Sequence, residues 1–287
     1  MKFPTTYSEI LQRIQNLDPI RYGETRNHLS GDVSYLSPYI SRGVISTKMV
    51  LEAMLAKGFQ LEEIESLAKE LCWRDYFQRV AQVKDVQEDL KFQQYDVLHD
   101  EIPSSVVSAE TGIHGIDQAI RDLYAHGYMH NHARMYTASL VCNVAKSRWK
   151  LPSKWMYYHL LDGDFASNAC SWQWVAGSNS NKKYYANQEN INRYMSTQQH
   201  GTFMDRSYES FESMSVPKEL STTQGTSFPV KLPSQRTLNV NNNVPTYVYT
   251  YYNMDPTWYQ GIDGNRILLL EPSFLQPDKP LARLFSW

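Results

Sequence analysis

Glu70, Trp73 and Arg74 could together bind a polar ligand that carries a flat ring. They stand at positions i, i+3 and i+4, so on a helix they share one face. The carboxylate and the guanidinium supply charge and hydrogen bonds, and the indole supplies a stacking surface. The alternative is an ion pair between Glu70 and Arg74 beside a core tryptophan. The spacing leaves both interpretations open.

A second candidate group follows Gly127. Asn131 and Arg134 are helix neighbours placed just after this glycine, where the free N–H groups of a helix N-terminus would face an anion. His126 and His130 are four residues apart, but no third metal ligand has a fitting spacing. We therefore predict no metal site here and expect capping or solvated histidines.

Two aspartates flank a glycine in Asp162-Gly163-Asp164. One aspartate would suffice to cap a helix, whereas two carboxylates could also accept hydrogen bonds from ribose hydroxyls or a ring N–H. The later acidic positions of an EF-hand are missing. Close behind, Trp172 and Trp174 alternate, which predicts an extended or turning stretch; a pair of core tryptophans is the alternative.

A fourth stretch, residues 30–37, places small hydroxyl residues and a glycine before a predicted helix start. This pattern is typical of a loop that cradles phosphate, and equally of an ordinary helix cap.

The overall composition indicates a globular protein. Of 287 residues, 42% are hydrophobic and 20% are charged, which excludes global disorder and allows one or two domains. The formal net charge is −2, so any contact with nucleic acid requires a local patch. Three cysteines cannot supply the four that usually bind an iron–sulfur cluster. We find neither a signal peptide nor a membrane span and expect a cytoplasmic protein.

Residues 1–200 are predicted to be helices separated by short breakers. The expected helical stretches are 5–16, 36–57, 61–83, 114–126, 129–147 and one that starts at Trp155–Leu161. Pro19 is expected to end the first of them, and residues 86–110 are expected to be irregular.

The rest of the chain differs in amino-acid composition. Residues 201–245 are rich in Ser, Thr, Asn and Pro and are interpreted as a linker. Residues 246–287 are expected to form a short β-containing segment, with strands at Thr246–Tyr252 and Arg266–Leu270. Two strands cannot bury a core alone. They must pack against the helical body, pair with another chain, or belong to a domain cut off at residue 287. We favour packing against the helical body.

In their order, these motifs resemble the helical FAD-binding domain of the DNA photolyase/cryptochrome family over about residues 20–200. The motifs are Leu36-Ser37-Pro38-Tyr39, Glu70-Leu71-Cys72-Trp73-Arg74-Asp75-Tyr76-Phe77, Thr111-Gly112, Met129-His130-Asn131, Arg134-Met135, Asp162-Gly163-Asp164 and Trp172-Gln173-Trp174. The resemblance implies a mainly α fold. It also implies that FAD is the cofactor.

The resemblance further implies which residues bind FAD. These are Tyr22, Ser34, Leu36, Ser37, Arg74, Asn131, Arg134, Asp162, Gly163, Asp164 and Asn168. Asn168 falls beside flavin N5, where photolyases typically carry Asn and many signalling cryptochromes carry Asp or Cys. This residue therefore favours repair over signalling.

A pocket for damaged DNA is implied as well. Its members are Glu70, Trp73, Asn131, Met135 and Trp174, with the carboxylate contacting a flipped pyrimidine dimer and the indoles stacking on it. Lys182 and Lys183 would contact DNA phosphate or lie in a solvated loop. Repair in this family is photochemical: the excited reduced flavin lends an electron that splits the cyclobutane ring.

Trp172 and Trp149 match the first two members of the family's electron relay, and the distal place falls near Tyr95. Because tyrosine is harder to oxidise than tryptophan and must also lose a proton, we expect slow photoreduction. The antenna domain of the family is missing before the flavin domain, so we expect no antenna chromophore in this chain.

The leading hypothesis is a FAD-dependent, blue-light-driven photolyase that repairs cyclobutane pyrimidine dimers in DNA, with single strands as its candidate preference. The alternative is a cryptochrome-like light sensor without repair activity. A third is a flavin-free DNA-binding protein, against which Asp162, Asp164 and Arg74 argue.

Overall fold

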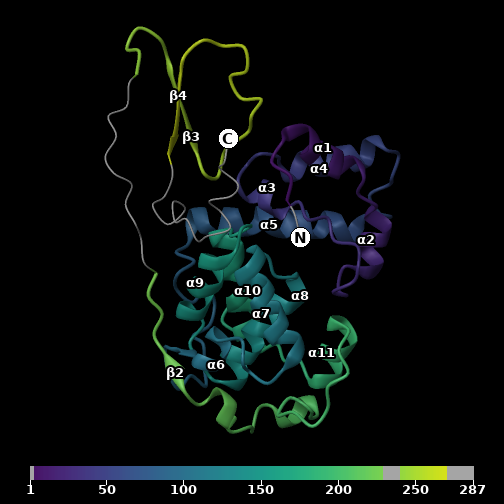
Figure 1. The fold of residues 1–287 in the computed structure, drawn as a ribbon, viewed down its shortest axis with the longest axis vertical. Helices are drawn as coiled ribbons and strands as arrows, with labels where there is room; N and C mark the ends of the chain where they lie inside the picture. The colour runs from purple at the N-terminus through teal and green to yellow at the C-terminus, as the bar shows by residue number, and fades with distance from the viewer. Residues whose placement is uncertain (1–2, 229–239, 270–287) are drawn as a thin grey trace.

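The computed structural model describes residues 3–228 and 240–269. The described helices are α1 (Tyr7–Gln15), α2 (Pro19–Thr25), α3 (Ser37–Ser41), α4 (Thr47–Ala56), α5 (Glu65–Val83), α6 (Ser104–Val107), α7 (His114–His126), α8 (Asn131–Ser139), α9 (Lys150–His159), α10 (Phe165–Ala176) and α11 (Gln188–Met195). A π-helical turn, Leu140–Val144, continues α8. Helix α5 lies between α1, α3 and α4 on one side and the group α6–α11 on the other, and α2 lies near one end of α5 (Figure 1). The predicted mainly α fold is confirmed.

Local chemistry explains where the first helices begin and end. Asp18 caps α2 by accepting two backbone N–H bonds at 3.0 Å, and Pro19 occupies the first helical position. Pro19 therefore begins a second helix besides ending the first. The single helix expected over 36–57 is two helices, because Gly43 adopts φ 62° between α3 and α4.

The helix expected from Trp155 begins earlier, at Lys150. Pro152 lies in the first turn of α9, where its missing N–H costs no hydrogen bond. This is why a proline near the start did not prevent the helix.

Two clusters of buried apolar side chains support the fold. The main core gathers residues of α7–α10, such as Ile116, Tyr136 and Trp155. A smaller core joins α1, α3, α4 and the start of α5, and includes Val50 and Leu67. Chain segments far apart in the sequence are thus fixed on either side of α5.

The segment expected to be a linker is irregular, but part of it belongs to the main core. Met204, Phe211 and Leu220 are buried there. Strand β2 (Thr223–Gln224) pairs with β1 (Ile102–Pro103), which lies in the stretch expected to be irregular. The apolar residues here follow no helical or strand period, so the sequence did not reveal their burial.

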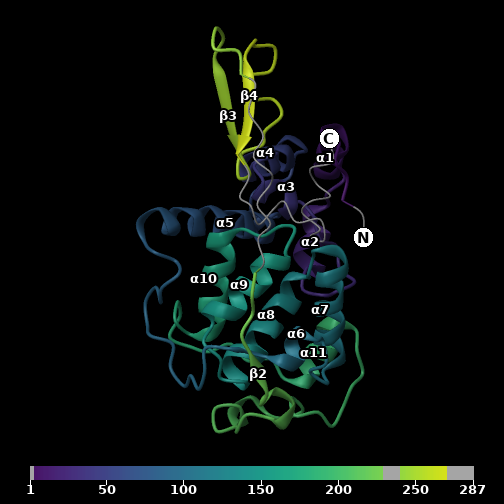
Figure 2. The same ribbon diagram turned by 60° about the vertical axis from the view of Figure 1, so that its left-hand side comes forward.

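Strands β3 (Thr246–Thr250) and β4 (Asn265–Leu269) form a parallel pair, with Thr246 opposite Asn265. Both strands extend beyond the helices in two views (Figures 1 and 2). Of the expected strand Thr246–Tyr252, the last residue contacts the helical body, since the hydroxyls of Tyr252 and Tyr157 lie 3.2 Å apart, whereas β3 and β4 themselves extend away from it (Figures 1 and 2). Within the described ranges, the turn after β3 makes that contact, through the hydrogen bond from Met254 N to Arg42 O at 2.9 Å.

The division of the chain into three parts, 1–200, 201–245 and 246–287, stays a prediction. Among the residues described, none of the helices is both long enough and apolar enough to cross a membrane.

Candidate functional site

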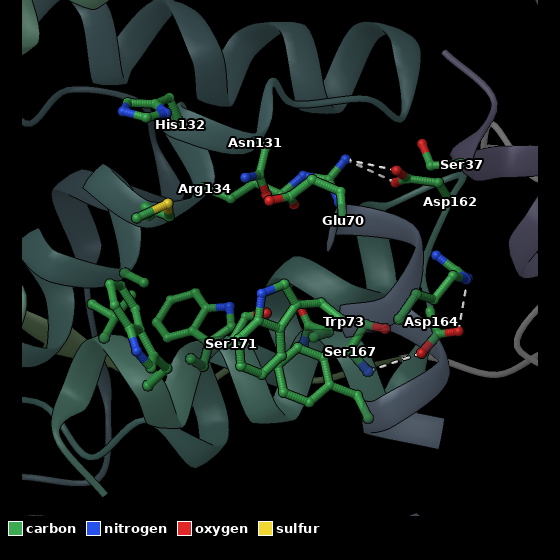
Figure 3. Close-up of a pocket in the computed structure, with 18 of the residues that line it drawn as sticks. Ser37, Glu70, Trp73, Asn131, His132, Arg134, Asp162, Asp164, Ser167 and Ser171 are labelled. Atoms are coloured by element: carbon green, nitrogen blue, oxygen red, sulfur yellow. Dashed lines mark hydrogen bonds and ion pairs between the residues drawn. The ribbon is translucent and has the colours of Figure 1, made fainter. Parts of the chain in front are cut away.

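A cavity of about 1460 Å³ opens beside α5, α8 and α10 (Figure 3). This exceeds the roughly 300–1,000 Å³ of ordinary small-ligand pockets. Most residues that the sequence singled out line it: Tyr22, Ser34, Ser37, Glu70, Trp73, Arg74, Asn131, Arg134, Met135, Asp162, Asp164, Asn168, Trp172 and Trp174. The fold therefore joins the predicted cofactor residues and the predicted lesion residues in one space.

Four predicted residues lie outside this lining, apart from the relay. Leu36 is buried in the smaller core and Gly163 has no side chain, so each could offer only its backbone. Lys182 is exposed. The side chain of Lys183 is only 3% exposed, and its Nζ lies 3.3 Å from Asp96 Oδ2. Lys183 is thus paired with a carboxylate that is 34% exposed, and the predicted contact of Lys182 and Lys183 with DNA phosphate stays a prediction.

Asp164 connects α5 to the start of α10. Its Oδ2 lies 2.7 Å from Arg74 Nη2 and also accepts from Gln78. Its Oδ1 accepts from Ser167 N at 2.8 Å and so caps α10. The predicted capping function is therefore seen at Asp164, which also pairs with Arg74, while hydrogen bonding of this carboxylate to a ligand stays a prediction.

Asp162 forms the second buried pair. Arg134 Nη2 donates to both of its carboxylate oxygens, at 2.9 and 2.8 Å, and Arg134 Nε donates to Met129 O at 2.7 Å. The Asp162 side chain is 3% exposed. Such charge-assisted bonds fix both side chains in one orientation at the cavity wall (Figure 3).

The predicted alternative of a Glu70–Arg74 ion pair is wrong. Glu70 Oε1 lies 2.8 Å from Arg26 Nη1, while Arg74 pairs with Asp164. Sequence reasoning missed Arg26, which also lines the cavity. Its position four residues after Tyr22, on the same helix face, was the available signal.

Burial changes the titration of several cavity residues. Burial raises the pKa of Tyr22 to about 12, and the charge of Glu70 adds to this. Burial lowers the pKa of His132 to about 4, with the positive charge of Arg26 adding to it. The pKa of His130 is also lowered to about 4, by burial and by His132. Both histidines are therefore neutral near pH 7.

The predicted capping function of His130 is confirmed. Its Nδ1 accepts from His132 N at 3.2 Å at the start of α8. Within the described residues, His, Cys, Asp and Glu side chains do not gather in groups of three that could bind a metal ion.

Trp172 and Trp174 lie in α10 and not in an extended stretch. Side chains two positions apart on a helix point in directions that differ by about 200° around the helix axis. Trp172 is accordingly buried at 2% exposure, while Trp174 is 42% exposed beside Tyr184. Both indoles line the cavity, one from the core side and one from its open side.

A second exposed indole stands on α5. Trp73 is 53% exposed, and its ring stacks on Phe77 with centroids 5.6 Å apart and meets the edge of Tyr76. Trp73 and Trp174 thus offer flat surfaces to a ligand that enters from solvent.

The three residues of the predicted relay differ in burial. Trp172 lines the cavity, and Trp149 shares the main core with it. Trp149 N donates to Gln94 Oε1 at 2.9 Å, and the neighbouring Tyr95 is 53% exposed. Whether electrons pass along these residues stays a prediction.

The residues present fit a large, polar cofactor that carries aromatic rings. Two buried ion pairs, two serines and several amides face a space that also contains indoles. Asn168 is fixed by donating from Nδ2 to Ser153 O at 2.9 Å. A mainly helical body with this cavity is typical of a domain that binds a large aromatic cofactor.

Comparison with known proteins identifies the family. Residues 66–231 match the FAD binding domain of DNA photolyase, which is more than half of the chain, and the chain belongs to this family. FAD is the cofactor of this domain.

Two curated relatives are named deoxyribodipyrimidine photo-lyase. The protein of Alkalihalophilus pseudofirmus is 32% identical over 148 residues, which is 50% of this chain and 31% of that one. The protein of Streptomyces griseus is 31% identical over 169 residues, which is 56% of this chain and 36% of that one. The chain thus spans about a third of the length of these relatives.

Solved structures confirm the fold. A cryptochrome from Synechocystis superposes with a TM-score of 0.57 at 24% identity, over 68% of this chain and 44% of that one. A class III photolyase from Agrobacterium tumefaciens gives a TM-score of 0.55 at 25% identity, over 66% of this chain and 44% of that one.

Proposed function

We propose that this protein repairs cyclobutane pyrimidine dimers in DNA, using FAD and blue light. The observation that carries the proposal is one shared cavity, in which fixed charged pairs lie beside exposed indoles and a carboxylate. FAD, when bound in its reduced form, supplies the light-driven electron. The photo-lyase names of the curated relatives support this substrate class.

The charged wall of the cavity binds and orients FAD. Arg134 and Arg74 are held by Asp162 and Asp164, so their remaining N–H groups face a defined direction. Ser34 and Ser37 contribute hydroxyls for the phosphates. Asn168, which lines the same cavity, would present its carboxamide to the flavin. Because these partners are fixed before the cofactor enters, little ordering entropy is lost on binding.

The open side of the cavity binds the damaged bases. Trp73 and Trp174 stack on the dimer and exclude water from it, while Glu70 accepts hydrogen bonds from its base edge. Arg26 orients Glu70 for this contact. A damaged site costs less to unpair than a normal base pair, and a single strand costs nothing to unpair. We therefore expect single-stranded DNA to be the better substrate.

The test compares pocket variants in a repair assay. Protein saturated with FAD and reduced beforehand is illuminated with a thymine-dimer oligonucleotide, and restored thymines are counted. Trp174→Ala and Glu70→Ala should each reduce the repair yield by about tenfold or more, since each removes a lesion contact worth roughly 1–3 kcal/mol. Trp258→Ala is the matched control, because Trp258 is similarly exposed at 40% and lies in the β3–β4 connection.

Equal repair by wild type, Trp174→Ala and Glu70→Ala would place the lesion elsewhere.

A light sensor without repair is the second candidate function. The contact between the turn after β3 and Arg42 favours it, because Arg42 also touches the loop that carries Asp162 and Asp164. Bound FAD with light-dependent spectral changes, but without any restored thymine, would select the sensor.

A further inference from the structure

Arg42 is a buried cation that lies outside the cavity lining. It follows α3 and is 1% exposed. Its Nη2 donates to Leu161 O at 3.2 Å and to Gly163 O at 3.1 Å. These two carbonyls flank Asp162 in the chain. One guanidinium therefore anchors the backbone on both sides of a carboxylate that faces the cavity.

The backbone of the same segment contacts the turn after β3. Arg42 O accepts from Met254 N at 2.9 Å. A Cβ on Gly43 would lie 2.2 Å from Tyr252 O, so only glycine permits this close approach. The hydroxyls of Tyr252 and Tyr157 lie 3.2 Å apart, which adds a contact between the turn and α9.

The geometry points to Arg42 as a positioning residue that couples FAD binding to docking of the turn 251–254. This inference rests on the proposed use of Asp162 and Asp164 to bind FAD. Asp162 orients Arg134, and Asp164 orients Arg74, so a displaced loop would misdirect both guanidinium groups. FAD bound to this wall orders the loop, the loop orders Arg42, and Arg42 with Gly43 forms the surface on which the turn docks.

Thermodynamic linkage makes this coupling reciprocal. FAD should protect the turn from opening, and weakening of the turn should weaken FAD binding. The expected effects are modest for the turn and larger for Arg42, because Arg42 makes direct hydrogen bonds to the loop.

The first measurement is the affinity of the full chain for FAD, which is determined from flavin fluorescence. Arg42→Met should weaken FAD binding by about tenfold, and Arg42→Lys by less. Arg121→Met is the matched control, since Arg121 Nη2 also donates to a backbone carbonyl, Ala109 O, but elsewhere in the body. Tyr252→Phe should weaken FAD binding by about twofold, while Tyr249→Phe, whose hydroxyl donates to Trp258 O, should leave it unchanged.

The second measurement is hydrogen exchange of residues 251–254 in the wild-type protein with and without FAD. Slower exchange with FAD supports the coupling and does not depend on any variant that fails to fold. If the wild type binds FAD while Arg42→Met binds it equally, and FAD leaves exchange of the turn unchanged, the coupling is overturned and the proposed function stands. A wild type that cannot bind FAD would overturn the proposed function itself.

Discussion

Asp162 and Arg134 carry opposite charges and pair at the wall of the cavity. The Asp162 side chain is 3% exposed, and Arg134 is its ion-pair partner in the structure as described. Arg134→Met should lower the free energy of unfolding by about 3 kcal/mol, because it leaves a buried carboxylate without its partner. Chemical denaturation of the variant measures this loss.

The companion variant Arg134→Met/Asp162→Asn removes the unpaired charge and should recover part of the stability. Lys48→Met is the control, since Lys48 and Glu52 are 80% and 61% exposed and their pair contributes at most about 0.5 kcal/mol. A cost for Arg134→Met no greater than that of Lys48→Met would contradict the account.

His130 makes stability depend on pH. Its pKa is lowered to about 4 in the folded protein, mainly by burial, from an ordinary value of about 6.5 in the unfolded chain. The unfolded state then binds more protons between these values. Stability should therefore be complete above about pH 6.5 and fall by up to roughly 3 kcal/mol as the pH drops toward 4.

The check is urea unfolding of wild type and His130→Asn between pH 7 and pH 4.5. Asparagine retains the helix-capping acceptor and does not titrate, so the slope of stability against pH should become shallower. His114→Asn, on the exposed start of α7, should retain the wild-type slope. Parallel slopes for wild type and His130→Asn would refute the assignment.

Residues of the site were predictable where one helix carries them, and less so where the fold joins distant ones. The shared face of Glu70, Trp73 and Arg74 follows from helical spacing. The partners Arg26 and Asp164 come from other segments, so the expected Glu70–Arg74 pair was wrong. Three-dimensional packing, and not local spacing, selects the partner of a charge.

At the scale of elements, the π-helical turn and α10 are joined through Asn143. This side chain is 1% exposed, and its Nδ2 donates to Val175 O at 3.0 Å and to Tyr184 O at 2.7 Å. Asn143→Leu should cost about 2 kcal/mol of unfolding free energy, because two buried hydrogen bonds disappear. Asn181→Leu is the control, because Asn181 is exposed in the connection between α10 and α11, and it should change the free energy of unfolding little in the same denaturation assay.

Helices α1, α5, α7 and α8 were predictable from apolar spacing and breaker residues, within a few residues at each end, whereas α2, α6 and α11 were not predicted. The error at Trp172 and Trp174 has a simple cause: alternation was interpreted as a strand period, although buried α10 is apolar on most of its surface. The strand pair was located correctly, but its placement depends on the tight contact at Gly43, which no local pattern reveals.

At the scale of the whole molecule, charge limits how DNA can bind. The net charge is −2. At the cavity rim, Arg26 is paired with Glu70 and Lys69 with Glu65. Lys91, which also lines the cavity, is exposed. We expect about three phosphate contacts at most, hence a slope of about −2 in log affinity against log salt for a single strand. Fluorescence anisotropy over a salt series measures it, and a slope steeper than about −5 would contradict a stacking-dominated site.

The central claim is that one cavity binds both the flavin and the damaged bases. The most direct measurement is repair of a single-stranded thymine-dimer oligonucleotide by the reduced, FAD-saturated wild-type protein, in blue light and in the dark. The account predicts that thymines are restored in blue light and not in the dark, and that the same lesion is repaired more slowly in a duplex. Bound FAD without any light-dependent repair of either strand form would contradict it.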